Sequence, residues 1–487
     1  MTDRRLGHFA AVMMACWGLA LPLSASVALA ADAVRFIERS PADPAAIPVA
    51  VEQEALAGAV LPAVLGDLVE AGRQLFRTKF TTADGAGRPL ATQATIPTRF
   101  KHRREALFQR ASGPDANACT SCHNDPADGG AGDFTANVFT SEGTESADFD
   151  TVDPQFSNER GTNHVFGSGL VELLAREMTA DLGAQRTAVL AQARATGQSA
   201  KVELSTKGVG FGRLSVAPDG LVDVSAVEGI DADLVVRPFS QKGVIPSLRM
   251  FTLNALNAHH GIQGAERFGA DMTAEDDFDG DGVASEFSPG QVSAMVAYQA
   301  ALPPPVARAH AKPDWRDAGI RGQAVFERIG CAGCHISELP LDSLVFADPG
   351  PHDTAGTLAA SDVSQPALYD LAGLDWAGQL RRDVEGRVLV PLFGDLKRHV
   401  ISDNRHTHFG NELMGQGFVA RDTFMTAELW GVADTGPYGH RGDVTSLGTV
   451  ILHHGGEARA ARDGFDALAA PERDDLISFL KTLRMPE

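Results

Sequence analysis

The stretch that decides the fold is GQAVFERIGCAGCHISELP, residues 322–340, with Cys331, Cys334 and His335 at its centre. A second copy of the motif, CTSCH, covers residues 119–123. Two cysteines at this spacing are compatible with a disulfide, a redox dithiol or half of a zinc site. None of these requires a histidine directly after each pair. Covalent c-type haem does, because both thiols add to the haem vinyl groups and the histidine binds the iron.

The number of cysteines favours the haem interpretation. The chain has 487 residues and five cysteines, of which Cys16 lies in a predicted leader. The other four all fall in the two motifs: Cys119, Cys122, Cys331 and Cys334. The sequence therefore predicts two covalently bound c-type haems, with His123 and His335 as the iron ligands from the motifs. A redox dithiol or a zinc site remains the alternative.

The first 30 residues have the pattern of a secretory signal peptide. Arg4 and Arg5 precede an apolar run over residues 9–23, and Ala28-Leu29-Ala30 supplies the small-residue cleavage pattern. No later apolar run reaches the roughly 18 residues of a membrane span. We therefore expect a soluble, exported, periplasmic protein.

The net charge excludes some classes of partner. The formal charge is −21, which argues against binding to nucleic acid or to anionic membranes. A basic soluble partner is compatible with it.

An internal repeat predicts the domain organisation. GRQLF (72–76) precedes the first motif and GQAVF (322–326) the second, each as part of an amphipathic helix. The proline-rich residues 303–315 read as an extended linker. We therefore expect a mainly α fold of two cytochrome c-like domains, residues 31–302 with insertions and residues 316–487.

Two further patterns define local elements. Within residues 202–236, apolar and polar residues alternate around Pro218-Asp219-Gly220, which predicts a small β-hairpin insertion. Near the C-terminus, PERDDLISFLKTL (471–483) places leucines and isoleucine at helical spacing after a proline. It predicts a terminal amphipathic helix.

Beyond the haem motifs, DLKRH (395–399), LWG (429–431), PYGHRG (437–442) and HHGGEA (453–458) follow in order. Together with GQAVFERIGCAGCH, this series resembles the di-haem oxidoreductase family, putative peroxidases related to the bacterial di-haem cytochrome c peroxidases. The chain departs from the family where His399-Val400-Ile401 replaces the usual His-Asp-Met.

The resemblance implies a function. Peroxide would be reduced at the N-terminal haem, with electrons relayed by the C-terminal haem from a soluble donor such as a small cytochrome c or a copper protein. Trp376 and Trp430 are candidates for positions between the haems, with core packing as the alternative for each. Two rival functions remain open, a di-haem electron carrier without catalysis and an oxidase or oxygenase of an organic or protein substrate.

The resemblance also implies roles for the C-terminal histidines. His454 would be the second iron ligand of the C-terminal haem, and His440 would lie beside a haem edge or propionate. Tyr438, His453, Met414 and Met425 are competing ligands. A structural role is expected for His399.

At the N-terminal haem the resemblance favours Glu172 and His259 as distal residues. Peroxide cleavage needs a base that takes a proton from one oxygen and returns it to the other. His164 and His260 are alternatives for this pocket. For Glu172, a capping or ion-pairing role is the competing interpretation.

An acidic loop predicts a third site. In DFDGDGVASEF (277–287), Asp277, Asp279 and Asp281 alternate before Gly282, as in the first half of an EF-hand calcium loop. Ser288 stands where the loop's final glutamate belongs, and Glu286 comes two residues early. The pattern predicts bound calcium, with an ordinary acidic turn as the alternative.

Overall fold

The computed structural model describes residues 33–88, 116–140, 157–354, 356–412 and 415–486, together with Leu90, Pro97 and Arg99. The predicted signal peptide and Met414 lie outside these residues. Of the described residues, 36% are helical and 18% are in strands. In the described part of the chain, no helix is both long enough and apolar enough to span a membrane.

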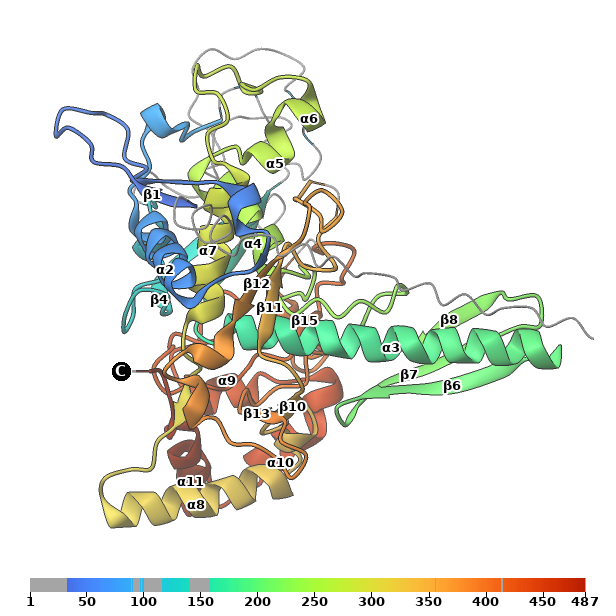
Figure 1. Ribbon diagram of the computed structural model, residues 1–487. Coiled ribbons are helices and arrows are strands. Elements are labelled where there is room, and N and C mark those ends of the chain that lie inside the picture. The colour runs from blue at the N-terminus through green and yellow to red at the C-terminus, as the bar shows by residue number, and fades with distance from the viewer. Residues whose placement is uncertain are drawn as a thin grey trace, which may run out of the picture.

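Helices form the framework around both motifs (Figure 1). α2 packs against α7, and α8 packs against α11, as the two most extensive helix pairs. The helices are α2 (Pro62–Arg77), α3 (Ser168–Thr196), α4 (Leu248–Ala255), α5 (Ala265–Phe268), α6 (Ala270–Thr273), α7 (Pro289–Ala301), α8 (Pro313–Arg328), α9 (Leu447–Leu452), α10 (Arg459–Asp466) and α11 (Ala470–Leu480). The predicted terminal helix is confirmed as α11, with Pro471 in its first turn.

The internal repeat has a physical reason in each helix pair. A Cβ on Gly72 would lie 1.9 Å from the carbonyl oxygen of Ala294, and a Cβ on Gly322 would lie 1.9 Å from that of Asp475. Both glycines therefore let the preceding helix approach its partner closely. Four residues later, the rings of Phe76 and Phe326 lie near the histidine of each motif.

Within the described residues, the strands form seven small sheets. They are β1 (Val34–Phe36) with β2 (Val49–Val51), β4 (Gly132–Thr140) with β5 (Ser157–Thr162), β6 (Ala200–Thr206) with β7 (Val209–Val216) and β8 (Val222–Val227), β3 (Gly58–Ala59) with β12 (Ala367–Asp370) and β11 (Val345–Asp348), β10 (Leu339–Leu341) with β13 (Val388–Val390), β14 (Arg398–Val400) with β15 (Thr423–Met425), and β9 (Val306–Ala307) with β16 (Leu483–Arg484).

The strands correct the predicted fold class. The expectation of a mainly α fold with two cytochrome c-like domains and only small hairpin insertions is wrong, because short strands recur along the whole described chain. Most are two to four residues long, and two pairs join segments that are far apart in the chain, β3 with β12 and β9 with β16. Such segments are too short for an alternating pattern, so no local signal marks them.

The predicted hairpin is confirmed. β7 and β8 are antiparallel on either side of Pro218-Asp219-Gly220, and β6 completes the sheet. Figure 1 shows this sheet running alongside the long helix α3, so that together they project from the rest of the molecule.

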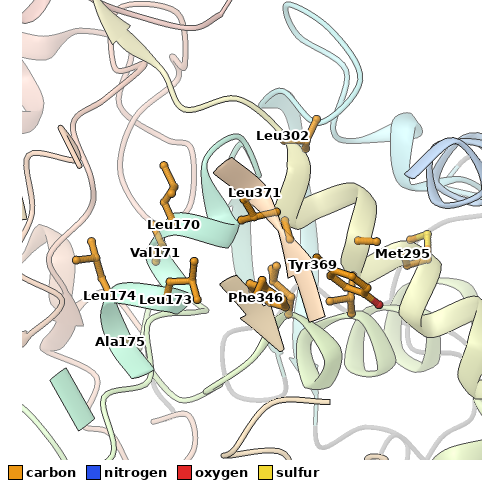
Figure 2. Packing of buried hydrophobic residues seen from close by; sticks show 14 of the residues in the cluster. Leu170, Val171, Leu173, Leu174, Ala175, Met295, Leu302, Phe346, Tyr369 and Leu371 are labelled. Carbon is orange, nitrogen blue, oxygen red and sulfur yellow. The ribbon is translucent and has the colours of Figure 1, made fainter. Parts of the chain in front are cut away.

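The larger hydrophobic core crosses the predicted linker. It runs from Ala33 to Met485, and Figure 2 shows part of it, including Leu170 and Leu173 of α3 and Phe346 of β11. A second, smaller core lies between α8 and α11. The linker itself pairs as β9 with β16 and leads into α8. The division into residues 31–302 and 316–487 stays a prediction.

Candidate functional site

Both motifs fold as the same short turn. Cys119–Ser121 and Cys331–Gly333 are single 3-10 turns. The amide of His123 donates to the carbonyl oxygen of Cys119 over 2.9 Å, and that of His335 to Cys331 over 3.0 Å. None of the four motif cysteines is in a disulfide bond within the described part of the chain. Each turn therefore brings two available thiols and an imidazole into one small loop.

The imidazole of His335 is fixed in its orientation. Its Nδ1 lies 3.1 Å from the carbonyl oxygen of Phe393 and donates to it. Burial and the neighbouring His454 lower the pKa of His335 to about 4, so the ring is neutral at pH 7. With the proton on Nδ1, the lone pair on Nε2 is available for a metal.

The residue that supplies the acceptor for His335 has an unusual backbone conformation. Phe393 has φ of +53°, a left-handed conformation that is costly for a bulky residue. The residue after Phe393 is bonded to the residue after the motif, because the amide of Gly394 donates to the carbonyl oxygen of Ile336 over 3.0 Å. The fold thus maintains the strained turn that supplies the acceptor for His335.

His454, which lies near His335, shows the same arrangement. It follows α9, and its Nδ1 lies 2.8 Å from the carbonyl oxygen of Val450. Burial lowers the pKa of His454. The two rings are close enough for His454 to lower the pKa of His335. The structure therefore brings together the two histidines that the sequence analysis paired.

The competing ligands have other contacts. His453 stacks on His408 with ring centroids 3.9 Å apart. The hydroxyl of Tyr438 donates to the carbonyl oxygen of Val432 over 3.1 Å. The Met425 side chain lies against Gly243. Met414 is outside the described residues.

His440 and His454 both lie near the ring of Phe409. The Phe409 ring centroid is 5.9 Å from that of His440 and 5.5 Å from that of His454. Nε2 of His440 is 2.9 Å from Oδ1 of Asn411. Burial, followed by the charge of Arg160 and other nearby cations, lowers the pKa of His440 to about 2. A neutral His440 thus borders a strongly positive region.

That positive region is buried and was missed by sequence reasoning. Arg160 is 6% exposed and pairs with Glu412, yet its Nε and Nη2 have no hydrogen-bond partner among the described residues. Lys242 donates to three backbone carbonyls and lies over the ring of Phe424. Arg441 alone had a sequence signal, since it follows His440 in PYGHRG. Arg160 and Lys242 lie in segments with no motif.

His399 is an ion-paired structural residue. Its Nε2 is 2.8 Å from Asp395 and its Nδ1 is 2.7 Å from Glu457. Burial alone would lower the pKa of His399, but the hydrogen bonds to these carboxylates and to Cys334 raise it to about 11. The cationic ring of His399 therefore links Asp395 and Glu457 beside the second motif.

Around the first motif, three further histidines gather. Nε2 of His260 is 3.7 Å from Sγ of Cys119, and its Nδ1 is 3.1 Å from the carbonyl oxygen of Ala116. Burial and the proximity of His123 lower the pKa of His259 to about 4. The pKa of His164 also falls to about 4, chiefly through burial and to a smaller extent through the proximity of His123.

Glu172 has capping and pairing contacts. It is 1% exposed, and its Oε1 accepts from Arg176 over 2.5 Å. Its Oε2 accepts from the amide of Leu248 over 2.8 Å, at the first residue of α4. Burial raises the pKa of Glu172 to about 7. α4 continues directly into a π-helical turn, Leu256–His260, which carries His259.

The three loop aspartates converge. One carboxylate oxygen from each of Asp277, Asp279 and Asp281 lies within 4.8 Å of the others. The structure thus brings together the residues that the sequence analysis assigned to calcium.

The residues around the motifs fit haem. The four motif cysteines form no disulfide among the described residues, and both C-terminal imidazoles are neutral with Nδ1 fixed on a carbonyl oxygen. The unpartnered guanidinium nitrogens of Arg160, whose charge acts on the nearby His440, fit a carboxylate such as a propionate. This donor set suits a c-type haem at Cys331, Cys334 and His335.

No family model matches the chain, and no curated protein matches it. Among solved structures, one neighbour is hydrazine synthase of Kuenenia stuttgartiensis, studied under xenon pressure. Its TM-score is 0.35 at 14% identity, over 99% of this chain and 100% of that one.

A second structural neighbour is a MauG-like protein associated with microbial copper homeostasis. Its TM-score is 0.28 at 18% identity, over 55% of this chain and 78% of the other. Both TM-scores are too low to carry an argument about fold or activity. The resemblance to the di-haem oxidoreductase family therefore rests on the motifs alone.

Proposed function

We propose that this chain carries two covalently bound c-type haems and is an exported, periplasmic oxidoreductase that reduces hydrogen peroxide at its N-terminal site. The observation that carries the proposal is a difference between the two motif histidines. His335 faces His454, whose Nδ1 donates to Val450 and whose Nε2 is left as a ligand atom. Near His123, by contrast, Nε2 of His164 lies 3.2 Å from the carbonyl oxygen of Trp430 and Nε2 of His260 lies 3.7 Å from Sγ of Cys119, so both of these Nε2 atoms are engaged by other groups.

At the C-terminal site, the chain supplies two neutral imidazole ligands. Phe393 and Val450 hold the protons on Nδ1 of His335 and His454, which keeps each Nε2 basic and correctly oriented. When bound, haem supplies one-electron chemistry at its iron. Two side-chain ligands make this the closed site, suited to accepting electrons from a donor and passing them on.

At the N-terminal site, the chain supplies a proton acceptor. His259 is neutral at pH 7, so one of its ring nitrogens can take a proton from peroxide and return it to the departing oxygen. Reducing hydrogen peroxide to water takes up two electrons and two protons. The electrons would come through the C-terminal site and the protons from solvent.

Glu172 acts in this scheme as a positioning residue. Its carboxylate caps α4 at Leu248, and α4 runs without a break into the turn that carries His259. Helix capping of this kind stabilises the first turn and fixes the axis of the helix. The contacts of Glu172 support an effect on catalysis through His259 rather than direct contact with substrate.

The charge of the chain supports a basic electron donor. At −21 the protein attracts a positively charged partner at low ionic strength. A small cytochrome c or a copper protein with a basic face fits that requirement. The acidity also argues against nucleic acid as a partner.

The test has two steps. Mass spectrometry of the purified holoprotein should show two haem additions, and the double variant Cys331→Ser/Cys334→Ser should keep one, on Cys119 and Cys122. The half-reduced protein should then turn over hydrogen peroxide with an artificial donor. His259→Ala should lower kcat/KM about 100-fold or more, as expected for loss of a general base, while both haems remain attached.

A second function is favoured by one observation. His259 and His164 both lie close enough to His123 to respond to its charge, so either ring could close the N-terminal site. A chain with both sites closed would be an electron carrier. Low-spin spectra at every reduction level, without peroxide turnover, would establish that function. An open N-terminal site without peroxide turnover would instead support oxidation of an organic or protein substrate.

A further inference from the structure

The acidic loop between α6 and α7 is folded so that its carboxylates converge. Asp277 Oδ1 accepts from the amides of Gly280 over 2.8 Å and Asp281 over 3.1 Å, and its Oδ2 accepts from Gly282 over 3.1 Å. Gly282 has φ of +95°, a conformation that glycine adopts readily and that allows the sharp turn of the loop. Carboxylates that repel one another are thus held within 4.8 Å, an arrangement that a cation would stabilise.

An independent observation at this loop also points to a ligand. Asp279 is 0% exposed, and its Oδ2 has no hydrogen-bond partner among the described residues. A buried carboxylate with an unpartnered oxygen is costly. The positive charge of Arg88 acts on Asp279 and on Glu286, yet burial and mutual repulsion still raise the pKa values of both. One guanidinium therefore does not balance the carboxylates of the loop.

We propose that Asp277, Asp279 and Asp281 bind one calcium ion through their carboxylate oxygens. Calcium accepts six to eight oxygen ligands in flexible geometry, whereas magnesium demands a near-octahedral set. Three side-chain oxygens from one loop, completed by water, suit calcium. Asp277 and Asp281 are partly exposed, which gives water and the ion access to the loop from solvent.

The loop is joined by contacts to the first haem motif. Phe287 lies at its end and meets Phe80, with ring centroids 6.2 Å apart. Phe80 lies 5.2 Å from the ring of His260, whose Nε2 is 3.7 Å from Sγ of Cys119. Glu286 also accepts from the amide of Gln263, just after the His259–His260 turn. Calcium would therefore order the segment that packs against this motif.

The experiment compares the holoprotein with Asp277→Asn and Asp279→Asn. Asp276→Asn is the matched control, because this substitution removes the same charge from an exposed residue that is not part of the carboxylate cluster. After treatment with a chelator, calcium is titrated by calorimetry and counted by elemental analysis. We expect one ion per chain in the wild type and the control, and at least about tenfold weaker binding in the two site variants.

Hydrogen exchange provides the second readout. Calcium should slow exchange in residues 256–264 of the wild type and the control but not of Asp277→Asn or Asp279→Asn. Equal calcium binding by the wild type and both site variants would overturn the site, and so would equal affinity for magnesium. Calcium binding without slower exchange in residues 256–264 would overturn the coupling to the motif. Neither result depends on the haem assignment, which mass spectrometry tests separately.

Discussion

Nε2 of His164 lies 3.2 Å from the carbonyl oxygen of Trp430. The backbone at this point is also tied to the C-terminal site, because the amide of Leu429 donates to the carbonyl oxygen of Phe393 over 3.3 Å. Phe393 in turn accepts from His335. A continuous set of hydrogen bonds and backbone therefore links the surroundings of the two motifs. Its members come from both sides of the predicted linker.

This link predicts a stability effect at His164. His164→Leu should leave the carbonyl oxygen of Trp430 without its donor in a buried position, at a cost of about 1–3 kcal/mol. His164→Gln keeps an N–H donor of similar reach and should lose less. Chemical denaturation of the holoproteins measures both. Because Nε2 is engaged by Trp430, the optical spectrum of the N-terminal haem should be unchanged in His164→Gln, and a change of spin state would identify His164 as an iron ligand.

The pairing of His335 with His454 predicts a change of spin state. His454→Ala removes one of two neutral imidazoles and should convert a low-spin haem signal to high-spin in electron paramagnetic resonance. His453→Ala is the matched control, since His453 is its neighbour in sequence and stacks on His408 instead. An unchanged spectrum in His454→Ala, or the same conversion in His453→Ala, would refute the assignment.

The haem motifs and the repeat could be predicted from the sequence because their signals are local. Each CxxCH motif forms one turn, and Gly72 and Gly322 occupy equivalent positions in helices that the periodicity marks. The order of motifs after the second haem loop placed His454 near His335 in advance of the structure. Residues within short, chemically specific patterns are thus the ones that sequence reasoning finds.

What the sequence did not predict is long-range. The strand pairs β3–β12 and β9–β16 join segments of only two to four residues that are far apart in the chain. The positive cluster combines Arg160, Lys242 and Arg441 from three distant segments, beside the neutral His440. Glu172 was predicted beside a haem, and its observed contacts are with Arg176 and Leu248. Pairing across such distances is decided by tertiary packing, which leaves no period or motif in the sequence.

The ion-paired His399 predicts a stability effect that depends on pH. Its pKa is raised to about 11 in the folded chain, from the usual 6.5 of a histidine, so its contribution is fully present below about pH 6.5 and is lost as pH rises through about 11. His399→Gln leaves the buried Asp395 without its cationic partner and should cost about 3 kcal/mol near neutral pH.

The measurement for His399 is the free energy of unfolding of the wild type and His399→Gln at several pH values. The difference should be largest at and below pH 6.5 and should shrink toward pH 11. Glu457→Gln is a useful comparison, because Glu457 is about half exposed and its loss should cost less. A difference that is independent of pH would mean that His399 acts by packing and not by charge.

The last prediction concerns Asp279 in the calcium-free protein. Burial, together with the charges of Asp281 and Asp277, raises its pKa from 3.8 to about 7 in the folded chain. A carboxyl with a raised folded pKa stabilises the fold when protonated, so this contribution is present below about pH 3.8 and is lost as pH rises through about 7. In the presence of a chelator, the unfolding temperature of the wild type should therefore fall over this range relative to that of Asp279→Asn, which cannot ionise.

Calcium should reverse the order at pH 7 and above, because the ion binds the ionised aspartates of the wild type and stabilises the state that binds it. Differential scanning calorimetry across pH 4 to 8, with and without calcium, gives all four curves. Parallel curves for the two proteins in chelator would show that Asp279 does not titrate in this range, and an unchanged order on adding calcium would show that its carboxylate is not a ligand.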